Sequence, residues 1–254
     1  MKIAVAGATG RLGAHIVDVV RERGHDVVPI SRGNGVDVVT GEGLENALTG
    51  VDVIIDAATG PSPDLDEATA FFTASARNLH EVGAAAGVRR MVVVSIIGID
   101  GLQGGYSVAK LAHEKAALSG PLPVRILRAA QFHEFVGTLL DWATQGEVGY
   151  AGDVKTQLVA ARSVAEVMVD LATDSSPADD ATRPFLEVAG PRAENLIDAA
   201  TLLAAKRGRP TKVEFGNNPD DPDAEANANG ALLPGPDAIL TGPTFEAWLE
   251  TADV

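Results

Sequence analysis

Three residues in the middle of the chain have the types and the spacing needed for proton transfer: Ser95, Tyr106 and Lys110. Because Tyr106 and Lys110 are four residues apart, they lie on one face of a helix. A neighbouring ammonium group favours the phenolate and lowers the pKa of a tyrosine from its reference value of about 10. Such a tyrosine is suited to donate a proton to a carbonyl oxygen, which a serine hydroxyl can hold in place. The alternative is a surface Tyr–Lys pair at a helix start, since this spacing also arises by chance.

A second set of residues, at the start of the chain, is suited to bind a dinucleotide. An apolar β-prone run from Lys2 to Ala6 leads into glycines at 7, 10 and 13, and apolar residues then recur at helical spacing until Gly24. In a strand–turn–helix unit these glycines allow a tight turn, close approach of a pyrophosphate and packing of the helix on the strand. The helix N-terminus then presents N–H groups to the phosphates. We expect the whole turn to contact the cofactor: Gly7, Ala8, Thr9, Gly10, Arg11, Leu12 and Gly13.

The end of the second expected strand, Asp26 to Ser31, indicates which dinucleotide is bound. An acidic residue there would accept hydrogen bonds from the adenosine ribose and repel a 2′-phosphate, but the sequence offers Ser31 and Arg32, with Arg11 in the glycine turn. A guanidinium is a planar fork that pairs well with phosphate. We therefore expect NADP(H), with NAD(H) as the less favoured alternative. Asp37 is expected either at the adenine or as a solvated loop carboxylate.

The remaining strands predict the fold class. Val51 to Asp56, Met91 to Ser95 and Val124 to Leu127 are short buried runs separated by helical patterns. This alternation predicts an α/β protein with a Rossmann-type doubly wound parallel sheet. Ala57, Ala58 and Thr59, at the end of the third strand, leave space for the cofactor, although a plain loop would look the same. Phe71 and Phe72 are expected in the core.

The two motifs resemble those of the short-chain dehydrogenase/reductase superfamily. Its atypical and extended members carry GATGxxG directly after the first strand, as Gly7 to Gly13 do here, and its Ser…YxxxK pattern matches Ser95, Tyr106 and Lys110. The resemblance implies that Ser95 holds the substrate oxygen, that Tyr106 donates the proton and that Lys110 also binds the nicotinamide ribose. The interval of eleven residues from Ser95 to Tyr106 is shorter than is usual in the short-chain subgroup. Atypical members often lack the tyrosine, so Lys110 is the safest of these assignments.

The segment from Arg128 to Phe135 resembles the ILRaxQFHEF segment of a bacterial branch of atypical NAD(P)H-binding proteins close to NmrA-like proteins. The resemblance covers nearly the whole chain and implies that Gln131, Phe132 and His133 line the nicotinamide or substrate pocket. A lone histidine is more often structural, and we favour that role over a catalytic one for His133. The other four histidines, His113 among them, are expected at solvated helix positions, and no histidine–carboxylate spacing predicts a metal site.

Composition narrows the classes of function. The chain has 254 residues and a net charge of −15, which opposes non-specific attraction to nucleic acid or anionic membranes. It contains no cysteine, which excludes disulfides, thiol catalysis and cysteine metal sites. The first strand begins at Lys2, leaving no room for a signal peptide, and no apolar run reaches membrane-spanning length. We therefore expect a cytoplasmic protein with a small-molecule substrate and no nucleic-acid or membrane partner; a homodimer is compatible with the sequence.

Regularity weakens after the fifth strand. Residues 195–207 predict a helix ending near Gly208, residues 216–230 read as a long exposed or mobile loop, and the apolar residues of Phe245 to Leu249 predict a docked tail. No sharp linker is present. We expect a single domain over residues 1–254, in which residues 129–254 contribute most of a small C-terminal substrate lobe.

Together these features favour an NADP(H)-dependent oxidoreductase that transfers hydride to a small organic carbonyl, quinone or similar acceptor. A non-catalytic, NmrA-like redox sensor that binds a protein partner is the alternative, and the presence of Tyr106 argues against it because a sensor needs no proton donor. An isomerase or dehydratase that uses its bound dinucleotide transiently is a third hypothesis. The sequence does not indicate the substrate.

Overall fold

The computed structural model describes residues 1–174, 185–216 and 220–254. Two short 3₁₀ turns occupy Arg32–Asn34 and Ile99–Gly101. The helices are α1 (Arg11–Glu22), α2 (Leu44–Leu48), α3 (Leu65–Ala85), α4 (Gly105–Leu118), α5 (His133–Trp142), α6 (Ala161–Thr173), α7 (Leu196–Arg207), α8 (Ala224–Ala228) and α9 (Phe245–Thr251). The strands are β1 (Lys2–Ala6), β2 (Asp26–Ile30), β3 (Val53–Asp56), β4 (Arg90–Ile96), β5 (Val124–Ala129), β6 (Thr144–Gln145), β7 (Val148–Ala151), β8 (Lys155–Thr156), β9 (Phe185–Ala189), β10 (Glu194–Asn195), β11 (Lys212–Phe215) and β12 (Ile239–Leu240).

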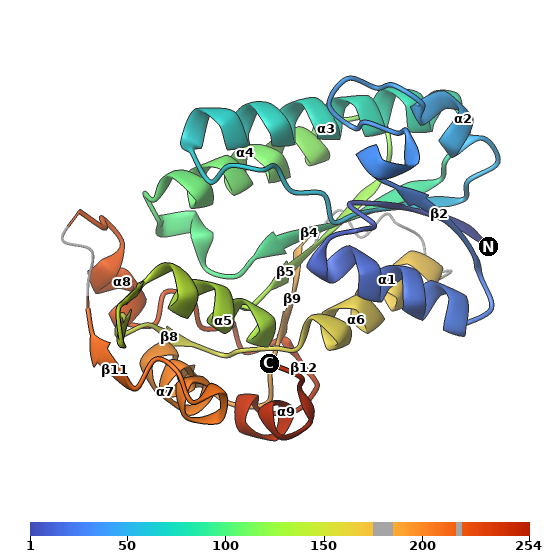
Figure 1. The fold of residues 1–254 in the computed structure, drawn as a ribbon. Helices are drawn as coiled ribbons and strands as arrows, with labels where there is room; N and C mark the ends of the chain where they lie inside the picture. Colours follow the sequence, from blue (N-terminus) through green and yellow to red (C-terminus); the bar gives the residue numbers. More distant parts are fainter. Residues whose placement is uncertain (175–184, 217–219) are drawn as a thin grey trace. The chain divides into compact units, whose positions relative to one another are not determined.

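A seven-stranded sheet in the order β12-β9-β5-β4-β3-β1-β2 forms the centre of the fold. The pairs β1–β2, β1–β3, β3–β4 and β9–β12 are parallel. The chain passes from β1 to β2 on one side and then returns to place β3 on the other side of β1, which is the topological switch point where open α/β sheets bind ligands. Helices α2, α3 and α4 lie on one face of the strands and α1 and α6 on the other (Figure 1). The predicted Rossmann-type doubly wound sheet is confirmed.

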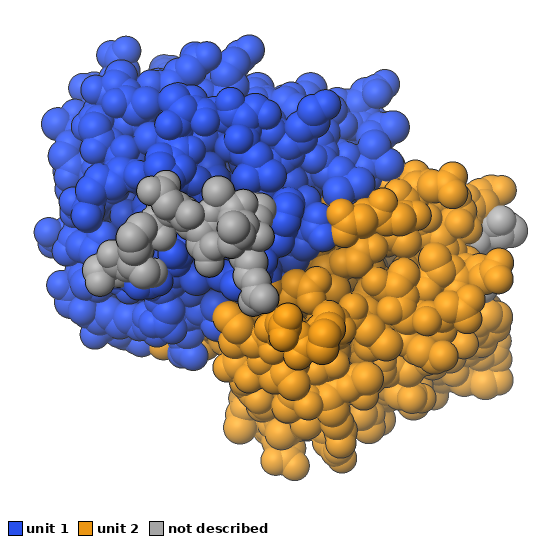
Figure 2. Space-filling model, turned by 180° about the vertical axis from the view of Figure 1, so that it is seen from behind, with its two compact units in different colours: residues 1–95, 105–128, 164–186 blue, residues 96–104, 129–163, 187–254 orange. Residues whose placement is uncertain are grey.

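The described residues form two compact units, each built from several segments (Figure 2). Unit 1 comprises residues 1–95, 105–128 and 164–186, and unit 2 comprises residues 96–104, 129–163 and 187–254. The core of unit 1 packs strand residues such as Ala4, Ile54 and Met91 against helix residues such as Leu79 and Ala117. These side chains are at most 9% exposed, and their removal from water is the main stabilising contribution to the unit.

The core of unit 2 lies among α5, α7 and α9. Val136, Leu140, Leu203, Phe245 and Leu249 pack together and are almost completely buried. The predicted C-terminal docking therefore takes the form of α9, which begins after Thr244 with that side chain accepting a hydrogen bond from the N–H of Ala247. Helix α7 begins after Asn195 and ends at Gly208, in the left-handed conformation, as the sequence indicated.

The expectation for residues 216–230 is wrong in part. Residues 217–219 lie outside the described residues, but Ala224–Ala228 form α8, and Asp223 before it is 6% exposed. The Asp223 carboxylate accepts hydrogen bonds from the N–H groups of Gln103 (2.8 Å) and Gly104 (2.7 Å). Its partners lie about 120 residues away in the chain, so the local Pro, Asp and Asn content gave no sign of this burial. Among the helices of the described residues, none has the length and apolar character needed to cross a membrane.

Candidate functional site

The glycine turn after β1 leaves no room for side chains at two positions. Gly7 has φ +76°, and a Cβ there would lie 2.5 Å from the carbonyl oxygen of Ala57. A Cβ on Gly13 would lie 2.0 Å from the carbonyl oxygen of Gly7. Gly10 closes the turn by donating its N–H to Gly7 at 2.9 Å. The turn is therefore packed tightly against the end of β3 and the start of α1, as a close approach of backbone to ligand requires.

The N-terminus of α1 is open to a ligand. Its N-cap is Gly10, and among the described residues no side-chain hydrogen bond caps this end of the helix. Thr9, Gly10 and Arg11 are exposed, whereas Ala8 and Leu12 are buried in the core. Helix N-termini attract anions because their backbone N–H groups and the helix dipole both favour negative charge. The turn therefore has the shape and the polarity that a pyrophosphate needs.

The residues after β2 also fit a nucleotide. The Ser31 hydroxyl is buried, and no hydrogen-bond partner for it is found among the described residues. Arg32 is exposed and is the first residue of the 3₁₀ turn. Asp37 uses one carboxylate oxygen to accept the N–H groups of Val39 (2.7 Å) and Thr40 (3.2 Å), so it at least shapes its own loop. An orphaned hydroxyl beside an exposed guanidinium suits a ribose bearing a phosphate.

The end of β3 joins the glycine turn to α4. The N–H of Ala57 donates to the carbonyl of Ala6 at 3.1 Å, which holds the ends of β3 and β1 side by side. Two residues on, the exposed Thr59 places its hydroxyl 3.2 Å from the hydroxyl of Tyr106, on the first turn of α4. Unit 1 thus brings together three of the sequence-predicted groups: the glycine turn, the loop of Ala57, Ala58 and Thr59, and Tyr106.

Ser95 lies near the end of β4, and Lys110, on α4, reaches the residue next to it. Ser95 is 2% exposed, and its hydroxyl is a second buried group for which the described residues provide no hydrogen-bond partner. Lys110, one turn after Tyr106 on α4, donates a hydrogen bond from Nζ to the carbonyl of Val94 at 2.9 Å. The ammonium group is therefore anchored to the residue that precedes Ser95. Buried polar groups are normally paired, so the Ser95 hydroxyl is a candidate to bind a ligand oxygen.

The expectation that His113 is solvated is wrong. Its side chain is 1% exposed, stacks on the Phe72 ring with 4.7 Å between centroids, and bridges Lys110 (Nδ1 to Nζ, 3.0 Å) and Asp56 (Nε2 to Oδ2, 3.1 Å). His80, on α3, is buried as well. The polar residues Glu114 and Lys115 beside His113 suggested a solvated face, but its spacing of three residues from Lys110 placed the two side chains together.

Burial and charge shift the pKa values of this buried group. Desolvation lowers the pKa of Lys110 to about 8, although the carboxylates of Asp56 and Glu114 counteract it. Desolvation, followed by the Lys110 charge, also lowers the pKa of His113, so the imidazole is neutral at pH 7. Desolvation is the largest single influence on Asp56 and raises its pKa, but the interactions with His113, Ala58 and Lys110 together outweigh it, so the pKa lies below its usual value. Glu114 forms a separate buried ion pair with Arg128 at 2.7 Å.

The three predicted substrate residues belong to unit 2. Gln131 accepts a hydrogen bond from the Thr156 hydroxyl, and Phe132 precedes α5 and bridges to Val159. His133 is completely buried, with Nε2 3.1 Å from the carbonyl oxygen of Pro243 and its ring against Phe245 and Trp248. Desolvation lowers the pKa of His133 to about 4. This environment favours the structural role for His133, while Gln131 and Phe132 are partly exposed.

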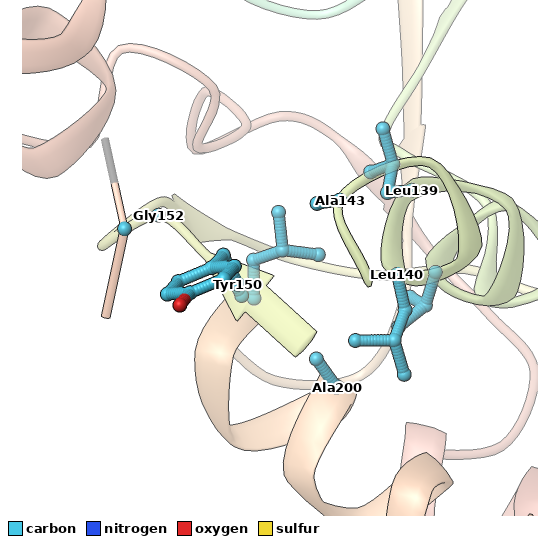
Figure 3. A pocket seen from close by; sticks show the side chains of 10 residues that line it. Leu139, Leu140, Ala143, Tyr150, Gly152 and Ala200 are labelled. Carbon is cyan, nitrogen blue, oxygen red and sulfur yellow. The ribbon is translucent and has the colours of Figure 1, made fainter. Parts of the chain in front are cut away.

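Unit 2 also contains a small apolar pocket of about 190 Å³ between α5, β7 and α7 (Figure 3). Leu139, Leu140, Ala143 and Ala200 line it, and the Tyr150 ring borders it. None of Gln131, Phe132 and His133 contributes to this pocket. It is therefore separate from the residues that the sequence assigned to the substrate.

Solved structures with similar folds cover nearly the entire chain. The structure of MoeE5 in complex with UDP-glucose and NAD is 20% identical, with a TM-score of 0.71 and coverage of 98% of this chain and 99% of that one. A GDP-6-OMe-4-keto-L-xylo-heptose reductase from C. jejuni is 12% identical, with a TM-score of 0.73 and coverage of 98% and 97%. The UDP-N-acetylglucosamine 4-epimerase from Bacillus cereus is 18% identical, with a TM-score of 0.69 and coverage of 98% and 94%. At these identities the similarity establishes the fold.

A family model identifies the class of cofactor. No curated protein matches the chain. The model of an NAD(P)H-binding family matches residues 7–175, which begin at the first glycine of the turn and include Ser95, Tyr106 and Lys110. The match agrees with the cradle formed by Gly7, Gly13 and the open N-terminus of α1. This chain is a member of the NAD(P)H-binding family.

Proposed function

We propose that the protein is an NADP(H)-dependent oxidoreductase that reduces a small organic carbonyl, quinone or similar acceptor. The observation that carries the proposal is the 3.2 Å contact between the hydroxyls of Tyr106 and Thr59. Through this contact Tyr106, on α4, lies beside the loop that follows β3, which supports its proposed role as the proton donor near the switch point of the sheet. Lys110 lies on the same helix and Ser95 at the end of the neighbouring strand, so the residue types needed for carbonyl reduction surround one edge of the sheet.

Each residue has a role that follows from its chemistry. The bound cofactor supplies the hydride. Tyr106 is half-buried and donates its phenolic proton to the acceptor oxygen. Ser95 offers to the same oxygen its hydroxyl, for which the described residues hold no partner, and so orients the acceptor. Lys110 lies one turn after Tyr106 on the same helix and provides a positive charge beside the cofactor.

The preference for NADP(H) rests on the end of β2. Arg32 is exposed, the adjacent Ser31 hydroxyl has no hydrogen-bond partner in the described part of the chain, and β2 ends without the carboxylate that would repel a 2′-phosphate. Arg11 is exposed at the start of α1 and adds a second guanidinium. Guanidinium groups at these two positions favour the cofactor with the additional phosphate.

Two alternative functions define what the experiment must separate. The similarity of fold to a UDP-N-acetylglucosamine 4-epimerase favours testing nucleotide sugars, whose epimerisation uses bound dinucleotide without net oxidation. A redox sensor would bind NADPH and catalyse nothing; the polar Tyr106–Thr59 contact speaks against it because a sensor does not require a proton donor there.

The experiment measures NADPH and NADH binding by fluorescence titration, and then NADPH oxidation with quinones, aldehydes, ketones and keto-sugar nucleotides. Tight NADPH binding with turnover supports the reductase. Tight binding without turnover of any acceptor favours the sensor, and a cofactor that copurifies and does not exchange favours the epimerase-type reaction. Absence of binding to both nucleotides contradicts the proposal.

A further inference from the structure

A chain of three buried polar side chains connects α4 to the end of β3. Lys110, His113 and Asp56 are 5%, 1% and 1% exposed. Nζ of Lys110 lies 3.0 Å from Nδ1 of His113, and Nε2 of His113 lies 3.1 Å from Oδ2 of Asp56. The other Asp56 oxygen accepts the N–H of Ala58 at 3.0 Å. The chain therefore ends on the loop that contains the Thr59 partner of Tyr106.

Elementary chemistry fixes the direction of these hydrogen bonds. An ammonium group has donors only, so Nδ1 of His113 accepts from Lys110. A neutral imidazole has one N–H, which must then be on Nε2, and it donates to the Asp56 carboxylate. The order is donor to acceptor throughout, from Lys110 through His113 to Asp56. Every polar atom of His113 is thereby used.

The arrangement also restricts the direction of the one ammonium N–H of Lys110 that these contacts do not use. One N–H is given to Val94 and one to His113, and the Phe72 ring lies 4.5 Å from Nζ.

We propose that His113 and Asp56 are positioning residues for Lys110, in which His113 holds the ammonium group and Asp56 holds His113 and balances the charge. This inference rests on the proposed function, in which Lys110 acts beside the cofactor. Neither residue touches the reacting atoms. Their effect on the reaction passes through the orientation and the protonation of Lys110.

The charges around Lys110 support this assignment. Desolvation brings its pKa to about 8, and Asp56 and Glu114 are the carboxylates that raise it. Asp56 has the larger effect of the two, and Glu114 is also paired with Arg128, at 2.7 Å. Among the described residues, the titratable and charged groups that act on the lysine are Asp56 on β3 and His113 and Glu114 on α4, with Arg128 on β5 paired to Glu114. A charged hydrogen bond or a close carboxylate shifts a buried pKa by about one unit or more.

The test compares His113→Leu, which removes both hydrogen bonds, with His113→Asn, whose amide oxygen can replace Nδ1 as the acceptor for Lys110. Asp56→Asn removes the charge and keeps an oxygen for His113. The matched control is His80→Leu, because His80 is also buried and bridges α3 to the carbonyl of Ala117 on α4 at 2.7 Å. Burial lowers the pKa of His80, so the control changes no charge at pH 8.

Two quantities are measured on the full chain with NADPH bound: the pKa of Lys110, by NMR of ¹³C-labelled lysine assigned with Lys110→Arg, and the alkaline limb of the pH–rate profile. We expect both to fall by about one pH unit in His113→Leu and Asp56→Asn, to recover largely in His113→Asn and to stay unchanged in His80→Leu. Equal pKa values in all four variants would overturn the proposal. If no acceptor is turned over, the proposed function fails, but the NMR titration still decides this inference. If His113→Leu does not fold, Asp56→Asn and His113→Asn decide it.

Discussion

The region around Lys110 in unit 1 and the region around His133 in unit 2 use a buried histidine in opposite ways. Both histidines are nearly inaccessible and packed on aromatic rings, His113 on Phe72 and His133 against Phe245 and Trp248. Both nitrogens of His113 are bonded to charged side chains. His133 bonds one backbone carbonyl, and among the described residues its Nδ1 has no partner.

The difference shows that burial alone does not reveal what a histidine does. Between an ammonium group and a carboxylate, an imidazole transmits orientation and charge from one to the other. An imidazole that packs among aromatic rings and makes one hydrogen bond to a backbone carbonyl instead holds two segments together and adds apolar contact. Substitutions around Lys110 should therefore change chemistry and its pH dependence, whereas a substitution at His133 should change stability.

The largest expected effect is at Tyr106. Tyr106→Phe removes the proton donor and keeps the ring that contacts Phe72, so turnover should fall by about a hundredfold to ten-thousandfold while NADPH binding is retained. Steady-state kinetics and fluorescence titration of the same preparation measure both quantities. If the variant turned over as fast as the unaltered protein, Tyr106 would not be the proton donor. The region around Lys110 would then not differ from the region around His133 by its role in chemistry.

Lys110→Met should make stability depend on pH in a defined direction. The lysine pKa is 10.5 when unfolded and about 8 when folded, so the folded state disfavours the charge. Its contribution to stability is present above pH 10.5 and is lost as pH falls through about 8. Between pH 8 and 10.5 the unaltered protein should gain about 3 kcal/mol relative to Lys110→Met. Urea unfolding across this range measures the difference, and a constant difference would contradict the buried charge.

His133→Gln tests, in the other region and at acid pH, how a shifted pKa makes stability depend on pH. The histidine pKa is lowered from 6.5 to about 4, so its stabilising contribution is present above pH 6.5 and is lost as pH falls through about 4. Glutamine can still donate to Pro243 but does not take up a proton. Between pH 6.5 and 4 the unaltered protein should lose about 3 kcal/mol relative to the variant. Parallel unfolding curves for the two proteins would show that His133 is less isolated from water than its burial indicates.

The sequence predicted the elements whose signals are local. A strand, three glycines and a helix follow one another within the first two dozen residues, and Tyr106 and Lys110 lie on one helix, so periodicity and spacing were sufficient. The roles of these residues in binding and catalysis stay predictions. The preference for a structural His133 agrees with its packing.

The interactions that the sequence did not reveal join residues far apart in the chain. His113 and Asp56 are 57 residues apart, and Asp223 and Gln103 are 120 residues apart. The polar neighbours of His113 in the sequence predicted a solvated side chain. The Phe72 ring and the Asp56 carboxylate that bury it come from α3 and β3, which are distant in the sequence. A histidine three residues after a candidate catalytic lysine was the one local signal available.

The smallest expected effect is at Arg32, which is exposed and therefore screened by salt. Arg32→Ala should reduce the preference for NADPH over NADH by about tenfold, because an exposed guanidinium contributes little more than 1 kcal/mol to phosphate binding. Titrations with both nucleotides at low and high ionic strength measure this preference. Arg89→Ala is the control, since Arg89 is also exposed but pairs with Asp52, which precedes β3 and lies beside the first residue of β1, at the opposite ends of these strands from Arg32. If both variants left the preference intact, recognition of the 2′-phosphate would have to come from Arg11, which is also exposed, or from the buried Ser31 hydroxyl.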